Sequence, residues 1–576
     1  MNSCCNSGAA LLGLLLLAAC TESGAPTPLS ASLCQADTTP INLIQGDGWY
    51  SLLQETTVTT RGTVTHISES HGVYIEDNAQ AWDGKRSRAL FIADESLSLS
   101  ALPGQVMAVN GQVAERGTSR DKQTSIIEVG NFEICADQSS LPQTRIALPL
   151  NSKSREALES MRVSLEQTLT VTDVYKLSSG EFTLSGSGVL RIPTEVKPPG
   201  KAAAEQERKN RNHSIVARLP KTGVSAMPVG SQFDDLSGLL GHNGRGQQLW
   251  LEGAPRADMP EPDTLKPAAA GYVRIVSSNL LNFFNGDGSG GGFPTDRGAK
   301  TYQEFLARAA RTRAAITRIQ PHLLAVQELE NDGFGPRSAV QTLLDLLNQS
   351  GNTDWAFIRP GSDRIGTDVI TVGLLYRQQV LEAVGKAHML QSPEFDGLSR
   401  QPLAQLFRDR RSGVEFLAAA NHLKSKGSCP DSGHNADQDD GQGCWNPARV
   451  AAVATQIEWL ENLGETLGTT NIMILGDMNA YRMEDPVASF KAASYIDLVE
   501  QISGLPQHSF LYRGQTGTLD YLFASPAVAG YARAAQIWHI NATLARNMDH
   551  PQPWLRASDH DPVIVDFDFS QPSTLD

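Results

Sequence analysis

Histidine, acidic and amide side chains suited to hydrolysis follow strand-like segments throughout the C-terminal half of the sequence. The clearest example is the stretch RASDHDPVIVDF (556–567), in which Asp559 and His560 come directly before an alternating apolar run. Because such alternation is typical of a half-buried strand, we expect His560 at the edge of a sheet. Taken alone, a cluster of this kind is more often a solvated turn with aspartate caps.

Further residues of the same chemical types occupy the same kind of position. They are Asn279, Glu328, His422, Asp477, Asn479 and Asp520. Each has a structural explanation when taken alone, since an acid can be solvated, an Asp-Asn pair can cap a turn and a histidine can be satisfied in a core. All of them, however, come at the ends of buried strands in one region, which favours a common site.

The set suits the hydrolysis of a phosphodiester, which needs charge neutralisation, an activated water and a proton donor. Asp520 can hold His560 in one tautomer, so that His560 acts as a general base toward water. His422 can donate to the leaving oxygen or stabilise the charge of the phosphorane. Asp477 and Asn479 would orient the water and the phosphate.

Glu328, with Asn279 close by, offers hard oxygen ligands that suit Mg²⁺, Mn²⁺ or Ca²⁺ rather than zinc. Arg364 and Lys424 are candidate phosphate contacts, and Asp368 could orient His422. For these last three residues a solvated charge is an equally good explanation.

Strands with interspersed helices are expected to position these residues. The apolar strand segments are YVRIVSSNLLNFF, HLLAVQE, VITVGLLY, VEFLAAANH, NIMILGDMN, LDYLF and VIVDFDF. A helix is expected from Thr301 to Pro321, with Thr301 and Glu304 as a capping box, and its apolar face includes Phe305 and Ile316. A second helix is expected at 446–464, with Asn446 as cap and Gly464 at its end. This alternation over some 300 residues predicts a layered α/β sandwich.

The N-terminal half has a different texture. Short alternating runs at 57–67, 72–77, 89–94, 105–113 and 125–134, punctuated by glycines, predict a small barrel of the OB type at 41–140. A second β-rich domain is expected at 141–254, with the polar stretch 197–213 as a loop. The proline-rich segment 255–270 is expected to be a linker to the catalytic domain at 271–570.

The chain has 576 residues, which predicts two to four domains, and a net charge of −15, which argues against broad attraction to nucleic acid. Its start predicts export. The apolar run 9–19 is too short to span a bilayer, and Leu17-Ala18-Ala19-Cys20 resembles a bacterial lipobox with Cys20 as the lipidated residue. We therefore expect a signal peptide at 1–20 and a tether at 21–40. Plain secretory cleavage is the alternative, because the first residues carry no Lys or Arg.

Four cysteines remain after those of the leader, and an even number in an exported protein suggests disulfides. The pairs Cys34–Cys135 and Cys429–Cys444 respect the expected domain boundaries.

The ordered motifs SSNLLNF, AVQELE, NHLKSKG, ILGDMNAY, LDYLF and SDHDPV resemble the endonuclease/exonuclease/phosphatase superfamily. The insert GSCPDSGHNADQDDGQGCWN and the upstream β-rich regions look like the bacterial extracellular endonucleases. The resemblance covers 271–569 strongly and 41–255 loosely. It implies an α+β protein whose catalytic domain is a four-layered α/β sandwich preceded by the OB-like region. It also implies that Asp559 helps to hold a metal.

The resemblance implies a metal-dependent endonuclease that acts on extracellular DNA, perhaps also on RNA, with membrane contact through a lipid anchor only and no obligate protein partner. A rival with the same fold is a sphingomyelinase or phosphoinositide phosphatase, although no aromatic-rich apolar hairpin for membrane insertion is apparent. A rival from another class is a non-catalytic binding lipoprotein.

Overall fold

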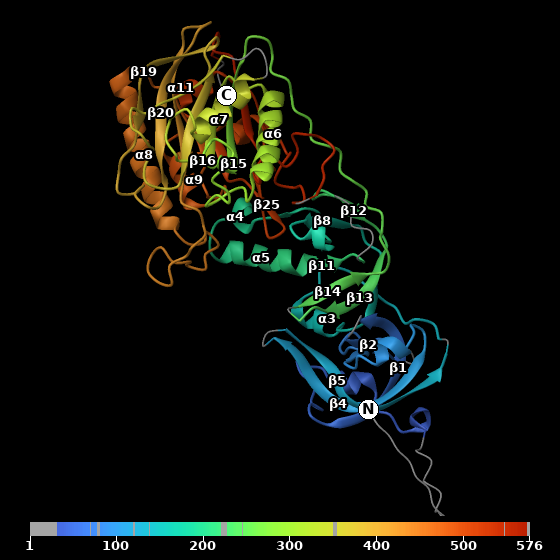
Figure 1. The fold of residues 1–576 in the computed structure, drawn as a ribbon. Helices are drawn as coiled ribbons and strands as arrows, with labels where there is room; N and C mark the ends of the chain where they lie inside the picture. Colours follow the sequence, from blue (N-terminus) through green and yellow to red (C-terminus); the bar gives the residue numbers. More distant parts are fainter. Residues whose placement is uncertain are drawn as a thin grey trace, which may run out of the picture.

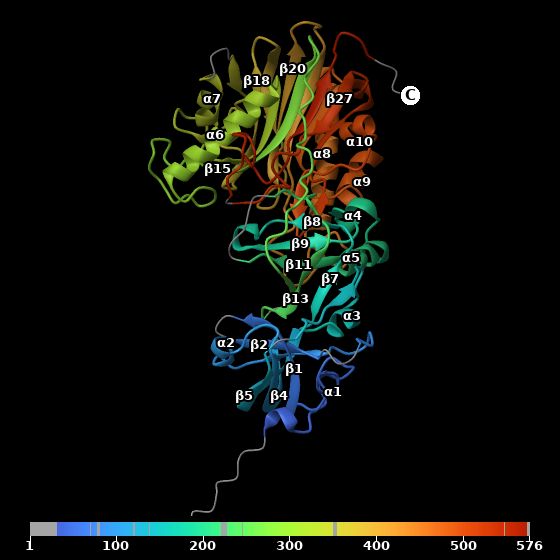
Figure 2. The ribbon, with the colours of Figure 1, turned by 90° about the vertical axis from the view of Figure 1, so that its right-hand side faces the viewer.

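The computed structural model describes residues 32–68, 71–77, 81–118, 121–137, 139–220, 227–244, 246–349, 354–546 and 548–572. Three units follow one another along the chain and are stacked from one end of the molecule to the other (Figures 1 and 2). The expected signal peptide with Cys20, and the tether as far as residue 31, lie outside the described residues. Within the described ranges, no helix is both long and apolar enough to cross a membrane.

The N-terminal unit is a closed barrel with the strand order β1-β2-β3-β5-β4. Its elements are a 3-10 turn at Leu33–Gln35, α1 (Ile41–Gln45), β1 (Thr57–Ser68), β2 (Gly72–Glu76), β3 (Ala89–Ile92), α2 (Leu97–Ser100), β4 (Val106–Thr118) and β5 (Asp121–Ala136). All five expected strands are present, and the barrel interior is filled by aliphatic side chains such as Val64, Leu90 and Ile126. The expected disulfide Cys34–Cys135 ties the start of this unit to β5.

The middle unit is built on an eight-stranded sheet with the order β12-β8-β9-β11-β14-β13-β7-β6. Its elements are β6 (Thr144–Ile146), α3 (Ser152–Glu156), β7 (Arg162–Leu165), β8 (Leu169–Asp173), a 3-10 turn at Leu177–Ser179, β9 (Glu181–Ser185), β10 (Leu190–Arg191), α4 (Pro193–Val196), α5 (Lys201–His213), β11 (Ser214–Arg218), β12 (Gln232–Phe233), β13 (Leu236–His242) and β14 (Gln247–Leu251).

The prediction of a loop at 197–213 is wrong, because most of this stretch is helix α5. Its polarity suggested a loop, yet its Ala, Glu, Gln, Lys and Arg residues are good helix formers. The pair Glu205–Lys209 also lies four residues apart on the helix surface. Ala203 and Asn210 are the buried residues of α5. A helix with so small an apolar face gives almost no periodic signal.

The C-terminal unit contains two six-stranded sheets, with the orders β17-β18-β16-β15-β28-β27 and β19-β20-β21-β22-β26-β23. Its elements are β15 (Val273–Phe283), α6 (Tyr302–Ile319), β16 (Leu323–Glu330), α7 (Ala339–Asn348), β17 (Trp355–Phe357), β18 (Ile370–Arg377), β19 (Leu381–Met389), β20 (Arg400–Asp409), β21 (Glu415–His422), α8 (Asn446–Leu467), β22 (Ile472–Asp477), α9 (Asp485–Ala492), β23 (Ile496–Asp497), α10 (Leu498–Ser503), β24 (Phe510–Tyr512), β25 (Gln515–Gly517), β26 (Asp520–Ala524), α11 (Pro526–Ala529), β27 (Ala532–Ile537) and β28 (Val563–Phe567).

One apolar core, which includes Ile275, Leu374, Phe407, Leu475 and Val565, draws residues from both sheets. A second core joins α6 and α7 to the first sheet, and a third joins α8 and α9 to the second sheet. The mixed α/β class expected from the sequence is confirmed.

The two long helices differ in how well their ends were predicted. The hydroxyl of Thr301 caps α6 by accepting from the backbone N–H of Glu304, as expected. In α8, however, Asn446 is the first helical residue and its side chain donates to Asp485 at 2.8 Å, while Trp445 is the N-cap. Helix α8 also runs past Gly464 and ends at Leu467, before Gly468 in the left-handed conformation.

The middle and C-terminal units are joined by a small sheet with the order β10-β25-β24. The segment 255–270 therefore separates the two units in sequence but not in space. Glu195 of α4 is buried and accepts from the backbone N–H of Thr518 at 3.0 Å, just before β26. Thr194 donates to Glu484 at 2.7 Å.

The disulfide Cys429–Cys444 closes the polar insert, with a Cα–Cα distance of 5.5 Å. The insert has little apolar surface, so we expect the double variant Cys429→Ser/Cys444→Ser to lower the free energy of unfolding by ~3 kcal/mol in the chain-entropy model. Urea denaturation measures this, with Ser432→Ala, in the same insert, as the control. A double variant as stable as Ser432→Ala would show that the cross-link contributes nothing.

Candidate active site

The strand register of the second sheet places four polar side chains in one row. Arg400 pairs with His422 across β20 and β21, His422 pairs with Asp477 across β21 and β22, and Asp477 pairs with Asp520 across β22 and β26. His422 lies two residues beyond Ala420, which belongs to the core between the sheets. Since side chains alternate along a strand, His422 faces the same side. The row therefore continues the inner face of the sheet beyond the apolar core.

His560 lies just before β28 of the other sheet, and its side chain lies against this row of residues. Its Nδ1 is 2.7 Å from Oδ2 of Asp520, and its Nε2 is 3.9 Å from Oδ2 of Asp477. Its ring packs on Phe510 with a centroid distance of 4.6 Å. Burial by itself lowers the pKa of His560, but the charges of Asp520 and Asp477 outweigh burial and raise this pKa well above its ordinary value. The expected His560–Asp520 pair is therefore present in the structure.

Asp477 is the hub of the buried cluster. Its Oδ2 lies 3.5 Å from Nε2 of His422 and accepts from the Asn279 amide at 3.3 Å, while its Oδ1 accepts from the backbone N–H of Asn479 at 2.8 Å. Burial raises the pKa of Asp477. Burial, and then the charge of Arg400, lower the pKa of His422 well below its ordinary value, so this imidazole is neutral.

Asn479 adopts a left-handed backbone conformation, with φ of 47°. Its side-chain amide donates to the carbonyl of Leu423 at 3.1 Å, directly after His422. Asn479 thus fixes the loop after β22 to the loop after β21.

Glu328 offers the best fit to a divalent cation among the described residues near this cluster. It lies at an irregularity of β16 with φ of 57°, and its Oε2 is buried without a hydrogen-bond partner. Burial, and then the charge of Asp559, raise the pKa of Glu328. The side chain of Asn279 is a further neighbour. A buried carboxylate oxygen that lacks a hydrogen-bond partner is costly, and a bound cation would remove that cost.

Asp477, Asp520 and His560 also have potential ligand atoms within 4.8 Å of one another. In this group, Nδ1 of His560 is hydrogen-bonded to Oδ2 of Asp520, whereas Oδ1 of Asp520 is buried without a hydrogen-bond partner. The expected metal residues Asn279, Glu328 and Asp559 offer only oxygen ligands, which Mg²⁺ prefers, although Asp559 also contacts Arg546 at 3.2 Å.

The structure contradicts one expected contact, that of Asp368 with His422, and shows other interactions for the candidate phosphate contacts Lys424 and Arg364. Asp368 does not orient His422, because its carboxylate pairs with Arg400 at 3.2 Å and Nδ1 of His422 has no hydrogen-bond partner. The ammonium of Lys424 is bonded to the carbonyls of Ser425 and Gly427, 3.2 Å away in each case. Arg364 is exposed, and its charge acts on Asp332.

Two residues of the site were missed by the sequence analysis. Arg400 is buried at the start of β20, and its charge acts on His422, Glu328 and Asp477. Ser509 donates to Oδ2 of Asp520 at 2.7 Å and fixes the carboxylate that holds His560. A strand at 400–409 could have been predicted from the sequence, and Arg400 at its start would then have been a candidate site residue. No sequence pattern indicates a role for Ser509.

The middle unit supports this site through Glu195. Its carboxylate accepts from both the backbone N–H and the hydroxyl of Thr518, two residues before Asp520, and burial raises its pKa to about 7. We expect Glu195→Ala to lower the free energy of unfolding by ~1–3 kcal/mol, because it leaves buried donors without an acceptor. Thermal denaturation measures this, with Glu205→Ala on the exposed face of α5 as the control. Equal stability of the two variants would contradict a supporting role.

Comparisons with known proteins agree with the family resemblance. No family model matches the chain. A deoxyribonuclease of Thioalkalivibrio sp. (strain K90mix) is 24% identical over 274 residues, which cover 44% of this chain and 65% of that protein. The match therefore spans less than two thirds of that relative.

Solved structures match about half of the chain. The human Nocturnin catalytic domain is 18% identical and matches over 52% of this chain and 96% of its own, with a TM-score of 0.35. An endonuclease/exonuclease/phosphatase from Bacteroides vulgatus is 15% identical over 52% of this chain and 98% of its own, with a TM-score of 0.36. TM-scores this low give the structural matches no weight for function. In sequence, the chain is similar to a deoxyribonuclease.

Proposed function

We propose that the protein is an exported endonuclease that depends on a divalent metal and hydrolyses phosphodiester bonds of extracellular DNA. The observation that carries the proposal is the buried His560–Asp520 pair together with the Glu328 carboxylate, one oxygen of which is buried without a hydrogen-bond partner. The similarity to a deoxyribonuclease supports a hydrolase of the nuclease or phosphatase type. The two disulfides support export, because disulfides form and persist mainly in oxidising compartments outside the cytoplasm.

In this proposal, the neutral form of His560 takes a proton from the attacking water at Nε2, and because Asp520 and Asp477 raise the pKa of His560, the population of this form increases as the pH rises. Asp520 accepts from Nδ1, which fixes the tautomer and stabilises the imidazolium that forms. Ser509 holds the Asp520 carboxylate in place.

The charge that develops on the phosphate needs donors on the opposite side. Neutral His422 can donate an N–H to the phosphoryl or leaving oxygen, and Arg400 adds a permanent positive charge beside it. Asp477 holds the backbone of Asn479, and the Asn479 side chain fixes Leu423, next to His422.

Glu328, Asn279 and Asp559 would hold Mg²⁺ or Mn²⁺, with Ca²⁺ as a further candidate. A bound cation of this class neutralises phosphate charge and polarises the phosphoryl oxygen. The catalytic unit is proposed to be a four-layered sandwich, the N-terminal barrel to be of the OB type, and Cys20 to carry the lipid.

A substrate panel tests the class of reaction. Purified protein with Mg²⁺ should cleave plasmid DNA, and RNA is tested beside it, whereas sphingomyelin vesicles and p-nitrophenyl phosphate should be turned over poorly or not at all. Faster turnover of either of the last two substrates would replace the endonuclease by a phospholipase-type or phosphatase activity. The Asp520→Asn variant serves as the background control for each substrate.

A further inference from the structure

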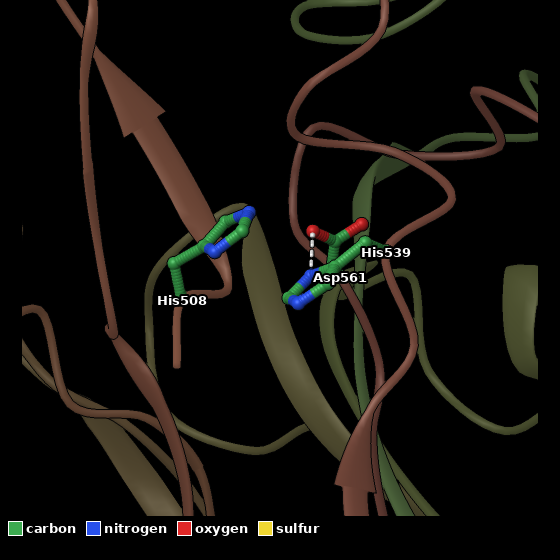
Figure 3. A group of neighbouring side chains, drawn as sticks. All are labelled: His508, His539 and Asp561. Carbon is green, nitrogen blue, oxygen red and sulfur yellow. Dashed lines mark hydrogen bonds and ion pairs between the residues drawn. The ribbon is translucent and has the colours of Figure 1, made fainter. Parts of the chain in front are cut away.

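A second group of possible metal ligands lies beside the active site (Figure 3). His508 comes between α10 and β24, His539 follows β27, and Asp561 comes just before β28. One ligand atom from each residue lies within 4.8 Å of the others. We propose that these three side chains bind a divalent cation of the zinc class, at a site separate from Glu328.

The hydrogen bonds of the group leave ligand atoms available. Oδ1 of Asp561 accepts from the backbone N–H groups of Ile540, Asn541 and Ala542 at 3.0, 2.7 and 3.1 Å. Its Oδ2 lies 3.2 Å from Nδ1 of His539. Nε2 of His508 is buried and has no hydrogen-bond partner. The backbone thus holds the carboxylate rigidly while its other oxygen faces the imidazoles.

The donor set selects the type of cation. Two imidazole nitrogens and one carboxylate oxygen suit Zn²⁺ or Co²⁺, whereas Mg²⁺ prefers oxygen ligands. Burial lowers the pKa of His508, whereas the hydrogen bond and the charge of Asp561 outweigh burial and raise the pKa of His539, so a cation would have to displace a proton from His539. The surrounding charges are mixed, since Asp263 accepts from the backbone N–H of His539 at 2.8 Å and Arg191 donates to the carbonyl of Gln507 at 2.8 Å.

The two imidazoles are stacked, with centroids 3.9 Å apart and planes at 4°. Parallel rings cannot both direct a nitrogen lone pair at one ion, so binding requires one ring to rotate about χ2. His508 can rotate at the lower cost, because its Nε2 has no hydrogen bond to lose. Its rotation would bring the third ligand to His539 and Asp561, and the cation would replace the proton shared by Nδ1 of His539 and Oδ2 of Asp561, which is released to solvent.

A cation here would tie together the segments that carry the His560–Asp520 pair. Asp561 follows His560 directly, and its backbone N–H donates to the carbonyl of Ser509 at 2.8 Å. Ser509 in turn follows His508 and holds Asp520. The expected role of the site is therefore to stabilise the active-site loops, whatever reaction they support.

The test is the thermal stability of the full chain, stripped of metal, with and without added Zn²⁺. His508→Phe keeps an aromatic ring against His539 but removes the ligand nitrogen, and His388→Phe on β19 is the matched control. His560→Ala removes the other possible histidine ligand, in the group with Asp477 and Asp520. Zn²⁺ should raise the Tm of the wild type, His388→Phe and His560→Ala, and leave that of His508→Phe unchanged.

Co²⁺ provides a second measurement that does not depend on stability. Visible d–d absorption typical of nitrogen ligation should appear in His560→Ala and be absent from His508→Phe. Should His508→Phe fail to fold, His539→Ala serves the same comparison. No Zn²⁺ effect on the wild type, or an effect that survives in His508→Phe and disappears in His560→Ala, would overturn the proposal.

Discussion

Replacing His560 by asparagine is expected to lower kcat for DNA hydrolysis by ~10²–10⁴-fold, the usual contribution of a general base. Asparagine retains an amide that can donate to Asp520 but cannot accept the proton of water. The alanine variant should lose as much activity but also stability, because it leaves the buried Asp520 carboxylate without its partner. Initial rates on plasmid DNA measure the first effect and melting temperatures the second.

The same experiment has an internal check. Asp520→Asn should reduce the rate in the same direction, since it removes the charge that stabilises the imidazolium. The double variant Asp520→Asn/His560→Asn should be barely slower than His560→Asn, because residues that act as a unit are not additive. Near wild-type rates in a folded His560→Asn protein would rule out His560 as the base.

Replacing Glu328 by glutamine is expected to raise the Mg²⁺ concentration for half-maximal activity by at least ~10-fold, since even residues behind metal ligands contribute that much to affinity. In EDTA, the same variant should melt at a higher temperature than the wild type. The reason is that Glu328 is a buried carboxylate with an unpartnered oxygen, and glutamine removes its charge.

Glu330→Gln is the matched control on the same strand. Its carboxylate accepts from the backbone N–H of Asn285 at 2.9 Å and therefore has a partner. An unchanged Mg²⁺ titration for Glu328→Gln, together with a lower melting temperature in EDTA, would show that Glu328 is structural and that the cation binds elsewhere.

Much of the candidate site could be predicted because its residues come at strand ends. His422, Asp477 and Asp520 each follow or begin an apolar strand, and the ends of neighbouring strands meet at one edge of a sheet. The sequence analysis also paired His560 with Asp520, and the structure contains this hydrogen bond. The structure adds the register, which aligns these three side chains in one row.

What could not be predicted depends on contacts between distant segments. The sequence analysis expected Asp368 to orient His422. In the structure, Asp368 forms an ion pair with Arg400 instead, and a permanent cation is the stronger partner for a carboxylate. Ser509 has no sequence signal, since its role arises only from the contact with Asp520. Helix α5 was missed because it buries mainly Ala203 and Asn210, which leaves no apolar periodicity.

The most direct test of metal-dependent phosphodiester hydrolysis is the initial rate at which the full chain nicks supercoiled plasmid DNA, measured with Mg²⁺ and with excess EDTA. The proposed mechanism predicts rapid nicking with Mg²⁺, none with EDTA, and recovery when Mg²⁺ is restored in excess. Nicking that continues unchanged in EDTA, or no nicking with Mg²⁺, Mn²⁺ or Ca²⁺, would contradict it.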